Sequence, residues 1–262
     1  DSITPQDTTV VVQQYSCLYG FTDATYDLYE DDIPKQMIIQ IGERVTFVNE
    51  MINYGALKAG TNAYFGGTGT ARASVNGGIT LGMLRKIARN LMANHAGMVN
   101  KQLGASGDFD TSAVEAGYTV YVHTDMRSDI RDLPNFVPVV KYASGKAMEN
   151  EFGTCEEFRF VSSPDLPSYQ NAGLAVGSTS LYSTGGSLID VYPFIVTGKD
   201  AWSQIAVRGV SALDPTFLPP GEKSKSDPLG QRGYAGTSWW KAVMLENQGW
   251  FAVGNVGVKT LA

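Results

Sequence analysis

The sequence predicts an α+β fold, on three observations. Two long amphipathic segments fall within the first 103 residues, which favours early helices. The apolar segments after residue 117 are short and bounded by turn residues, which favours late strands rather than alternating βαβ units. Glycine makes up 29 of the 262 residues, a high share that favours many turns and bulges.

The first elements predicted are an extended strand and a long helix. Residues 8–15 are β-branched and moderately polar, as in a strand with an exposed face. Acidic residues precede Pro34, a combination typical of a helix start, so we expect a helix over residues 32–57. Its apolar stripe comprises Met37, Ile41, Val45, Val48 and Ile52. A helix of this length suggests a structural spine.

A second helix is expected over residues 80–103, with Thr80 as its N-cap. Its stripe comprises Leu84, Ala88, Leu91, His95 and Met98. We expect a loop over residues 104–117, a buried strand over residues 118–123, and then a short helix that ends before Pro134.

The rest of the chain is expected to be mostly strands. After a short helix near residues 145–151, strands are expected at residues 158–161, 188–196, 202–207 and within 239–258. Residues 213–233 contain four of the eleven prolines and are expected to form a loop.

Composition and charge narrow the function classes. The chain can form one large or two modest domains. The net charge of −6 argues against a large electrostatic footprint on nucleic acid. Cys17 and Cys155 lie too far apart in sequence for a CxxC metal or redox motif. No apolar run reaches the ~18–20 residues of a membrane span, and no N-terminal signal is visible.

Motifs for cofactor or nucleotide chemistry are incomplete. A dinucleotide-binding loop would need the motif GxGxxG, but the segment that begins at Gly67 has Arg72 where the third glycine is required. The sequence also has no P-loop and no GxSxG nucleophile elbow. We therefore expect no catalytic residue, no cofactor and no metal. A hydrolase that uses Cys155 or the pair His123 and Asp125 stays open as an alternative, although Glu156 and its neighbour would raise the thiol pKa.

A second alternative is a nucleic-acid-binding accessory module. One segment mixes basic and aromatic side chains, as stacking platforms for single strands do. It comprises Lys223, Lys225, Arg232, Tyr234, Trp239, Trp240 and Lys241. The net negative charge weighs against this alternative.

Several blocks occur in the order typical of one protein family. In sequence order they are residues 121–132, residues 152–164, residues 190–202, and residues 227–233 (DPLGQRG) followed by Lys241 to Leu245. The block of residues 227–233 is the most specific. In these blocks the sequence resembles the major capsid proteins of tailed bacteriophages. The resemblance implies the HK97-like fold, with a spine helix, a peripheral domain, an axial domain and an extended β-loop arm.

The resemblance also implies a domain layout. Residues 1–20 would be the returning strand of the extended loop, and residues 21–117 the peripheral domain with both helices. Residues 118–231 would form the axial domain, and residues 232–262 would return to the peripheral domain. The family's N-terminal arm and the outgoing strand of the loop have no counterpart in these residues, so either they precede residue 1 or the assignment of the first twenty residues is wrong.

The function implied is that of a non-catalytic major capsid protein. It would assemble into hexamers and pentamers of an icosahedral phage head around double-stranded DNA, without sequence-specific DNA binding. The chain would be located in the capsid shell of the virion, which would be assembled in the cytoplasm of the bacterial host. Decoration, scaffold and portal proteins would be its partners besides copies of itself, and it would not bind a membrane. Candidate assembly contacts are Val10, Val12, Asp129, Arg131 and Arg232.

Overall fold

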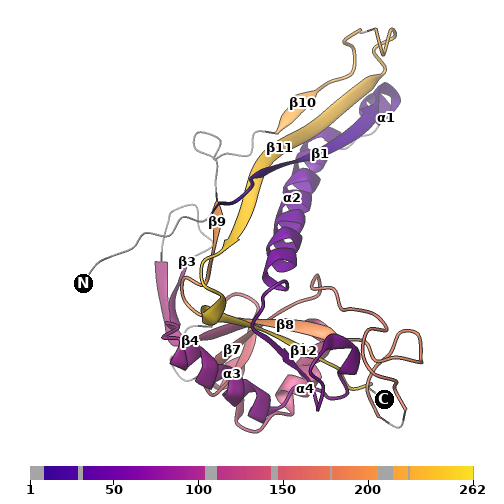
Figure 1. The fold of residues 1–262 in the computed structure, drawn as a ribbon. Coiled ribbons are helices and arrows are strands. Elements are labelled where there is room, and N and C mark those ends of the chain that lie inside the picture. Colours follow the sequence, from indigo (N-terminus) through magenta and orange to yellow (C-terminus); the bar gives the residue numbers. More distant parts are fainter. Residues whose placement is uncertain are drawn as a thin grey trace. The chain divides into compact units, whose positions relative to one another are not determined.

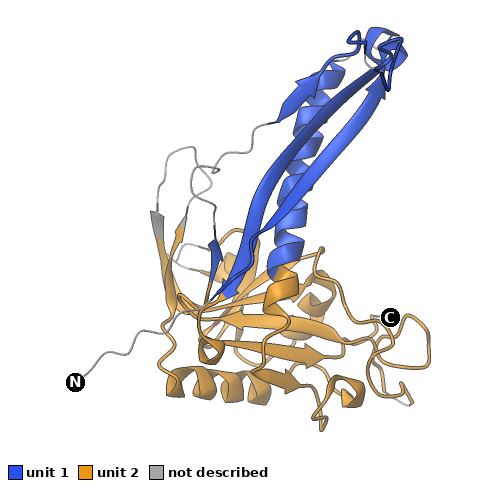
Figure 2. Ribbon diagram, turned by 45° about the horizontal axis from the view of Figure 1, so that its top comes forward, with its two compact units in different colours: residues 1–53, 203–244 blue, residues 54–202, 245–262 orange. Residues whose placement is uncertain are grey.

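A computed structural model of the chain describes residues 9–28, 32–103, 111–142, 147–177, 179–205, 215–223 and 225–261 (Figure 1). The chain divides into two compact units. Unit 1 comprises residues 1–53 and 203–244, and unit 2 comprises residues 54–202 and 245–262 (Figure 2). Each unit is therefore built from segments that are distant in the sequence.

Unit 1 is a four-stranded sheet with a helix against one face. Its strands are β1 (Gln13–Thr22), β11 (Arg232–Leu245), β10 (Thr216–Leu218) and β9 (Trp202–Ile205). β1 runs antiparallel to β11 over its whole length. The long helix α2 (Ile33–Leu57) follows the short helix α1 (Asp23–Leu28).

The helix-facing side of this sheet holds the core of unit 1. Ile41 and Val45 of α2 are each 2% exposed and pack with Ala235 and Trp239 of β11. Alternate residues of β1, among them Tyr15, lie on this side, because successive side chains of a strand point to opposite faces. The predicted helix of residues 32–57 is confirmed, and Met37, Ile41, Val45 and Val48 of its stripe pack on the sheet. Its role as a spine stays a prediction.

Unit 2 is built on an eight-stranded sheet. In spatial order its strands are β2 (Ala63–Phe65), β12 (Phe251–Val256), β8 (Tyr192–Thr197), β4 (Thr111–His123), β7 (Phe158–Ser163), β6 (Glu151–Cys155) and β5 (Phe136–Pro138), with β3 (Val99–Leu103) paired to β4. The helix α3 (Leu81–Ala93) starts at Thr80, whose Oγ1 accepts the Met83 N–H at 3.3 Å.

The core of unit 2 joins α3 to the sheet. Leu84, Ile87 and Leu91 of α3 are fully buried with Phe158 and Phe194 of the strands. The short elements are η1 (Arg72–Ser74), η2 (Thr124–Met126), α4 (Arg127–Arg131), η3 (Val139–Lys141) and η4 (Gln248–Trp250). Among the residues described, none of the helices combines the length and apolar character that a bilayer crossing requires. The α+β prediction is confirmed.

The second predicted helix is wrong in its C-terminal part. α3 ends at Ala93 with Asn94 as its C-cap, and residues 99–103 form β3. His95, expected on the helix stripe, is exposed and has a positive φ of 56°. The pairing of β3 with β4, rather than the local spacing of apolar residues, decides this segment.

Other expectations need correction for the same reason. Residues 111–117, expected in a loop, belong to β4, and residues 147–151 hold no helix because Glu151 begins β6. The expected loop of residues 213–233 contains β10 and the first residues of β11. The first strand is β1 rather than residues 8–15, and residues 9–12 have no regular structure. Residues 1–8, 104–110, 143–146 and 206–214 lie outside the described residues.

Candidate functional site

The two sites of the hydrolase alternative, Cys155 and the pair His123 and Asp125, lie at different places in unit 2. His123 Nδ1 accepts the Asp125 N–H at 3.1 Å and lies 3.2 Å from Asp125 Oδ2. Cys155 of β6 lies opposite Phe158 of β7, and Phe158 lies opposite Tyr118 of β4. Tyr118 is five residues before His123 on β4, so Cys155 lies near one end of this stretch and His123 at the other. At ~3.3 Å per residue, Cys155 and His123 are separated by roughly 16 Å along the strands. They therefore form no thiol–imidazole pair.

The Cys155 thiol is poorly placed to act as a nucleophile. It is 0% exposed, and its Sγ donates to the Pro134 carbonyl at 3.4 Å. Burial, followed by the charge of Glu156, raises the pKa of the Cys155 thiol. The uncharged thiol is thus favoured, whereas a catalytic cysteine requires the thiolate.

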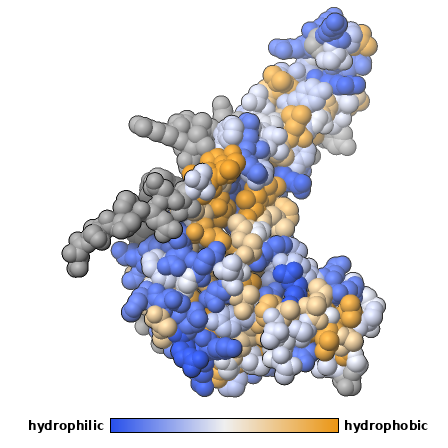
Figure 3. Space-filling model, in the orientation of Figure 1, coloured by the Kyte–Doolittle hydropathy of each residue, from blue (hydrophilic) through white to orange (hydrophobic). Residues whose placement is uncertain are grey.

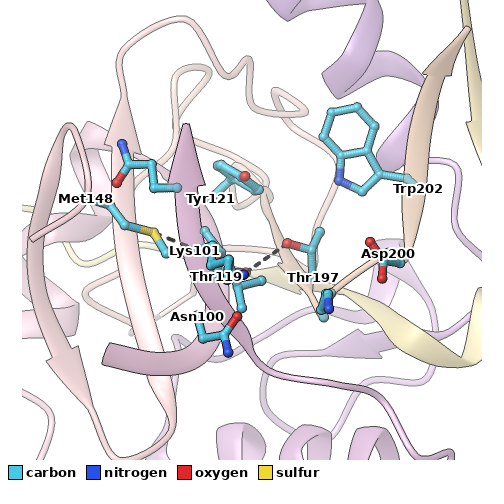
Figure 4. A pocket seen from close by; sticks show the side chains of 12 residues that line it. Asn100, Lys101, Thr119, Tyr121, Met148, Thr197, Asp200 and Trp202 are labelled. Carbon is cyan, nitrogen blue, oxygen red and sulfur yellow. Dashed lines mark hydrogen bonds between the residues drawn. The ribbon is translucent and has the colours of Figure 1, made fainter. Parts of the chain in front are cut away.

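A cavity of about 380 Å³ lies in unit 2 between β3, β4 and the turn from β8 to β9 (Figure 4). Met148 and Trp202 line opposite sides, with Thr119 and Thr197 between them. Thr197 Oγ1 donates to the Thr119 carbonyl at 3.4 Å, and Thr119 Oγ1 lies 3.9 Å from Met148 Sδ. The lining contains no histidine, cysteine or glutamate, so the residues of the hydrolase alternative lie outside this cavity. Within the described ranges, no three His, Cys, Asp or Glu side chains are grouped as metal ligands.

The basic and aromatic segment near the C-terminus is divided by the sheet of unit 1. Trp239 faces α2, where its Nε1 donates to Asn49 Oδ1 at 3.0 Å and its ring stacks on Tyr15. Lys241 faces the same way, is 7% exposed, and donates to the Asn49 carbonyl and to Gln204 Oε1. Burial lowers the pKa of this amine. These groups cannot stack on or neutralise a nucleic-acid strand outside the sheet.

The opposite, outer face of the unit 1 sheet carries exposed apolar side chains. They are Leu18 (68% exposed), Leu218 (49%), Trp240 (41%) and Tyr234 (36%), and we call this set the outer face of unit 1. The space-filling view shows separate apolar patches on this unit within hydrophilic surroundings (Figure 3). Large exposed apolar groups that share a surface are typical of protein contacts. The outer face of unit 1 is the candidate functional surface.

Close packing between neighbouring strands holds two of these side chains in place. Leu18 lies over Gly236, where an added Cβ would come within 2.8 Å of Leu18 Cδ1. Tyr234 lies over Gly20 in the same way, at 3.5 Å. Sequence analysis missed this surface because the alternation in β1 becomes informative only once its pairing with β11 is known.

The sequence-predicted assembly residues are spread over both units. Val10 and Val12 are half-buried in the segment before β1, and Arg232 is exposed at the start of β11. Arg131 is exposed in α4, whereas Asp129 of the same helix is 6% exposed and its Oδ2 accepts the Lys259 N–H at 3.0 Å. Their role in assembly stays a prediction.

The chain is similar in sequence to a curated capsid protein. No family model matches the chain. The chain is 22% identical over 265 residues to the major capsid protein of Pseudomonas phage KPP21, an alignment that covers 93% of this chain but 66% of that protein. It thus spans just under two thirds of the relative's length.

Solved structures of phage capsids have the same fold. The capsid of Ralstonia phage GP4 matches with a TM-score of 0.67 and 10% identity, over 97% of this chain and 75% of that one. The head of Helicobacter pylori bacteriophage KHP40 matches with a TM-score of 0.59 and 9% identity, over 95% and 74%. The Cyanophage Pam1 capsid matches with a TM-score of 0.59 and 13% identity, over 99% and 81%. The chain therefore has the HK97-like fold of tailed-phage capsid proteins.

Proposed function

We propose that this chain is a major capsid protein, whose copies assemble into hexamers and pentamers of an icosahedral phage head that encloses double-stranded DNA. The observation that carries the proposal is the sequence match to a phage major capsid protein across 93% of the chain, combined with the fold. The chain would reside in the capsid shell of the virion.

The fold by itself does not select a phage head. An encapsulin from Synechococcus elongatus PCC 7942, solved as a holo complex, matches with a TM-score of 0.56 and 12% identity over 96% of this chain and 76% of that one. The relative found by sequence is a phage protein, and that match favours the phage assignment over an encapsulin-like compartment.

The surfaces of the chain support a structural, non-catalytic role. Cys155 is buried and lies apart from the pair His123 and Asp125, and the basic–aromatic segment is divided between two faces. The net charge of −6 would also limit adhesion of packaged DNA to the shell, because phosphates are repelled rather than neutralised. Peripheral and axial domain names, and contacts with decoration, scaffold or portal proteins, remain predictions.

Electron microscopy and sedimentation of the purified full chain test the proposal. Closed shells, tubes or capsomer rings support it, and a monomer at every concentration contradicts it. Mass spectrometry of virions then distinguishes the two shell classes: a phage head requires this chain to be the most abundant virion polypeptide, with nuclease-protected DNA inside. A chain found only in DNA-free shells outside virions would favour the compartment.

The two alternatives have tests of their own. Cys155→Ala and His123→Ala variants that assemble like the wild type and lose no hydrolytic activity end the hydrolase alternative. Binding to single strands that is absent or insensitive to salt ends the accessory-module alternative, because phosphate contacts make affinity strongly salt-dependent.

A further inference from the structure

α3 carries basic side chains on the side that faces away from the core of unit 2 (Figure 1). Arg85, Lys86 and Arg89 are all exposed, and we call this set the basic face of α3. The helix contains no acidic residue. Its positive charge is therefore not neutralised within the helix itself.

The positive charge extends over the sequence around α3. Residues 51–103 contain six lysine and arginine residues and no aspartate or glutamate. Carboxylates that neutralise this segment must come from other parts of the chain or from another chain. Arg85 has such a partner in Glu156, whereas Lys86 and Arg89 have no ion pair among the residues that the structure describes.

Tyr64 of β2 lies beside both of these cations. The Lys86 Nζ is 5.8 Å from the centre of the Tyr64 ring. Burial raises the pKa of the Tyr64 phenol, and the nearby charge of Arg89 acts in the opposite direction. An aromatic ring attracts a cation but leaves its charge in place. Lys86 and Arg89 therefore present two positive charges on one surface, where they can bind carboxylates.

The short helix α1 of unit 1 has the complementary charge. It contains Asp23 and Asp27, one helical turn apart, and no basic residue. Asp27 is exposed and Asp23 is half-buried, and within the described part of the chain neither forms an ion pair. In the sequence, residues 23–32 contain five acidic residues and no lysine or arginine. The chain thus contains one strongly acidic and one strongly basic segment, each without local compensation.

The spacing of the charges is compatible on the two helices. At 1.5 Å per residue, Asp23 and Asp27 are separated by ~6 Å along α1. Lys86 and Arg89 are separated by ~4.5 Å along α3. The long side chains of lysine and arginine can absorb the difference, so both carboxylates can reach a cation at the same time.

Each helix also carries an exposed apolar side chain next to its charges. Leu28 directly follows Asp27 and is 81% exposed. Met92 is three residues after Arg89 and is 45% exposed. A contact between the two helices can therefore cover apolar surface as well as pair charges.

We propose that α1 of one copy docks on the basic face of α3 of a second copy, where Asp23 and Asp27 pair with Lys86 and Arg89. The two surfaces differ, so the contact is head-to-tail, and such contacts generate closed rings when the rotation between copies closes. A protein partner is favoured over nucleic acid because the chain itself supplies the acidic counterpart, and because its net charge of −6 repels phosphates. The inference rests on the proposed function, in which copies of this chain assemble.

Carbodiimide cross-linking tests this contact in the wild-type chain. The reagent joins a carboxylate to an amine that touches it, and Lys86 is the amine of the basic face. Particles are assembled from a mixture of unlabelled and isotope-labelled subunits and analysed by mass spectrometry. We expect peptide pairs that join Lys86 to Asp23 or Asp27, including pairs of mixed label, which can form only between copies. Lys86→Arg is the matched control: it keeps the charge but removes the amine, so particles should form without this cross-link.

Charge reversal gives a second readout. One variant carries Lys86→Glu and Arg89→Glu, and the other carries Asp23→Lys and Asp27→Lys. Exposed ion pairs are weak individually, but every subunit of a shell repeats the contact, so each variant should lower the yield of particles at least about tenfold. All four changes together exchange the signs of the two surfaces and should restore the yield.

A control variant carries the same change in net charge at other exposed positions. Arg44→Glu with Lys141→Glu alters one side chain of α2 and one of η3 and should assemble like the wild type. The variant of Lys86 and Arg89 should keep its fold because both side chains are exposed, and circular dichroism checks this.

The outcomes separate this inference from the proposed function. Wild-type particles in which Lys86 gives no mixed-label cross-link to α1 overturn the inference, while the capsid proposal stands. Two charge-reversal variants that fail to assemble and are not restored by their combination also overturn it, because the two surfaces would then have different partners. If the variant of Lys86 and Arg89 forms particles at the normal yield but without DNA, the basic face binds nucleic acid instead. If the wild type forms no particles, the capsid proposal fails, and mixed-label cross-linking of the soluble chain still decides whether α1 and α3 of two copies meet.

Discussion

Removing the guanidinium of Arg159 should weaken unit 2 severely, because this side chain neutralises a buried carboxylate. The side chain of Arg159 is 3% exposed and that of Glu151 is 0% exposed. Two bonds join them, from Nε to Oε1 at 3.1 Å and from Nη2 to Oε2 at 2.7 Å, and Nη1 donates to the Glu115 carbonyl at 2.6 Å. The Glu151 carboxylate also accepts the Tyr142 hydroxyl and the Met148 N–H.

The expected size follows from this geometry. In Arg159→Met the apolar stem remains, but the carboxylate stays buried with no cation. Breaking a buried pair in this way costs about 3–5 kcal/mol. Since each 1.4 kcal/mol is a factor of ten, amide hydrogens in β6 and β7 should exchange roughly 140- to 3,700-fold faster.

Hydrogen exchange followed by mass spectrometry measures this change strand by strand, which suits a chain with two units that need not unfold together. Arg85→Met is the matched control: it breaks the pair of Arg85 with Glu156, and the Arg85 side chain is 58% exposed, so exchange should not change measurably. Adding Glu151→Gln to Arg159→Met should restore part of the protection, since no charge is left unpaired. Equal exchange in Arg159→Met and Arg85→Met would refute the reasoning.

Three further predictions follow from buried groups. Val45→Asp buries an unpaired charge between α2 and the sheet, so it should lower the free energy of unfolding by several kcal/mol and give insoluble subunits. Thr46→Asp, on the exposed side of the helix, should stay soluble. Equal soluble fractions of the two variants after expression would contradict this. Burial lowers the pKa of Lys241, so at a pH above this lowered pKa the unfolded chain binds more protons than the folded chain. The free energy of unfolding of the wild type should therefore rise between pH 7 and 9.5 when it is compared with that of Lys241→Met. A difference that does not change with pH would rule this out. Cys155 should resist iodoacetamide until the chain is unfolded, whereas half-buried Cys17 reacts earlier; peptide mapping decides the order.

Local patterns were sufficient where an element depends on its own residues. The stripe from Met37 to Ile52 predicted α2 to within one residue, because a long amphipathic helix is defined by its spacing and its packing side. The buried strand of residues 118–123 was likewise visible as a short apolar run. The order of several sequence blocks then indicated the fold family.

Distant pairing decided the elements that sequence analysis missed. β3 and the first part of β4 form a hairpin from residues that were expected to continue a helix and a loop. The outer face of unit 1 depends on Leu18 lying opposite Gly236, and nothing near either residue in the sequence indicates the other. The candidate assembly surface could therefore be identified only from the structure.

The register of β1 with β11 has a consequence for synthesis of the chain on the ribosome. Gln13 meets Lys241, so 228 residues (241 − 13) must be translated before this pair can form. At about 5–20 residues per second, β1 waits for roughly 10–45 s without its neighbour. An uncharged, aromatic-rich strand that leaves the ribosome long before its partner strand is a natural ligand for chaperones, and the yield of soluble subunits should depend on how well the host cell supplies them.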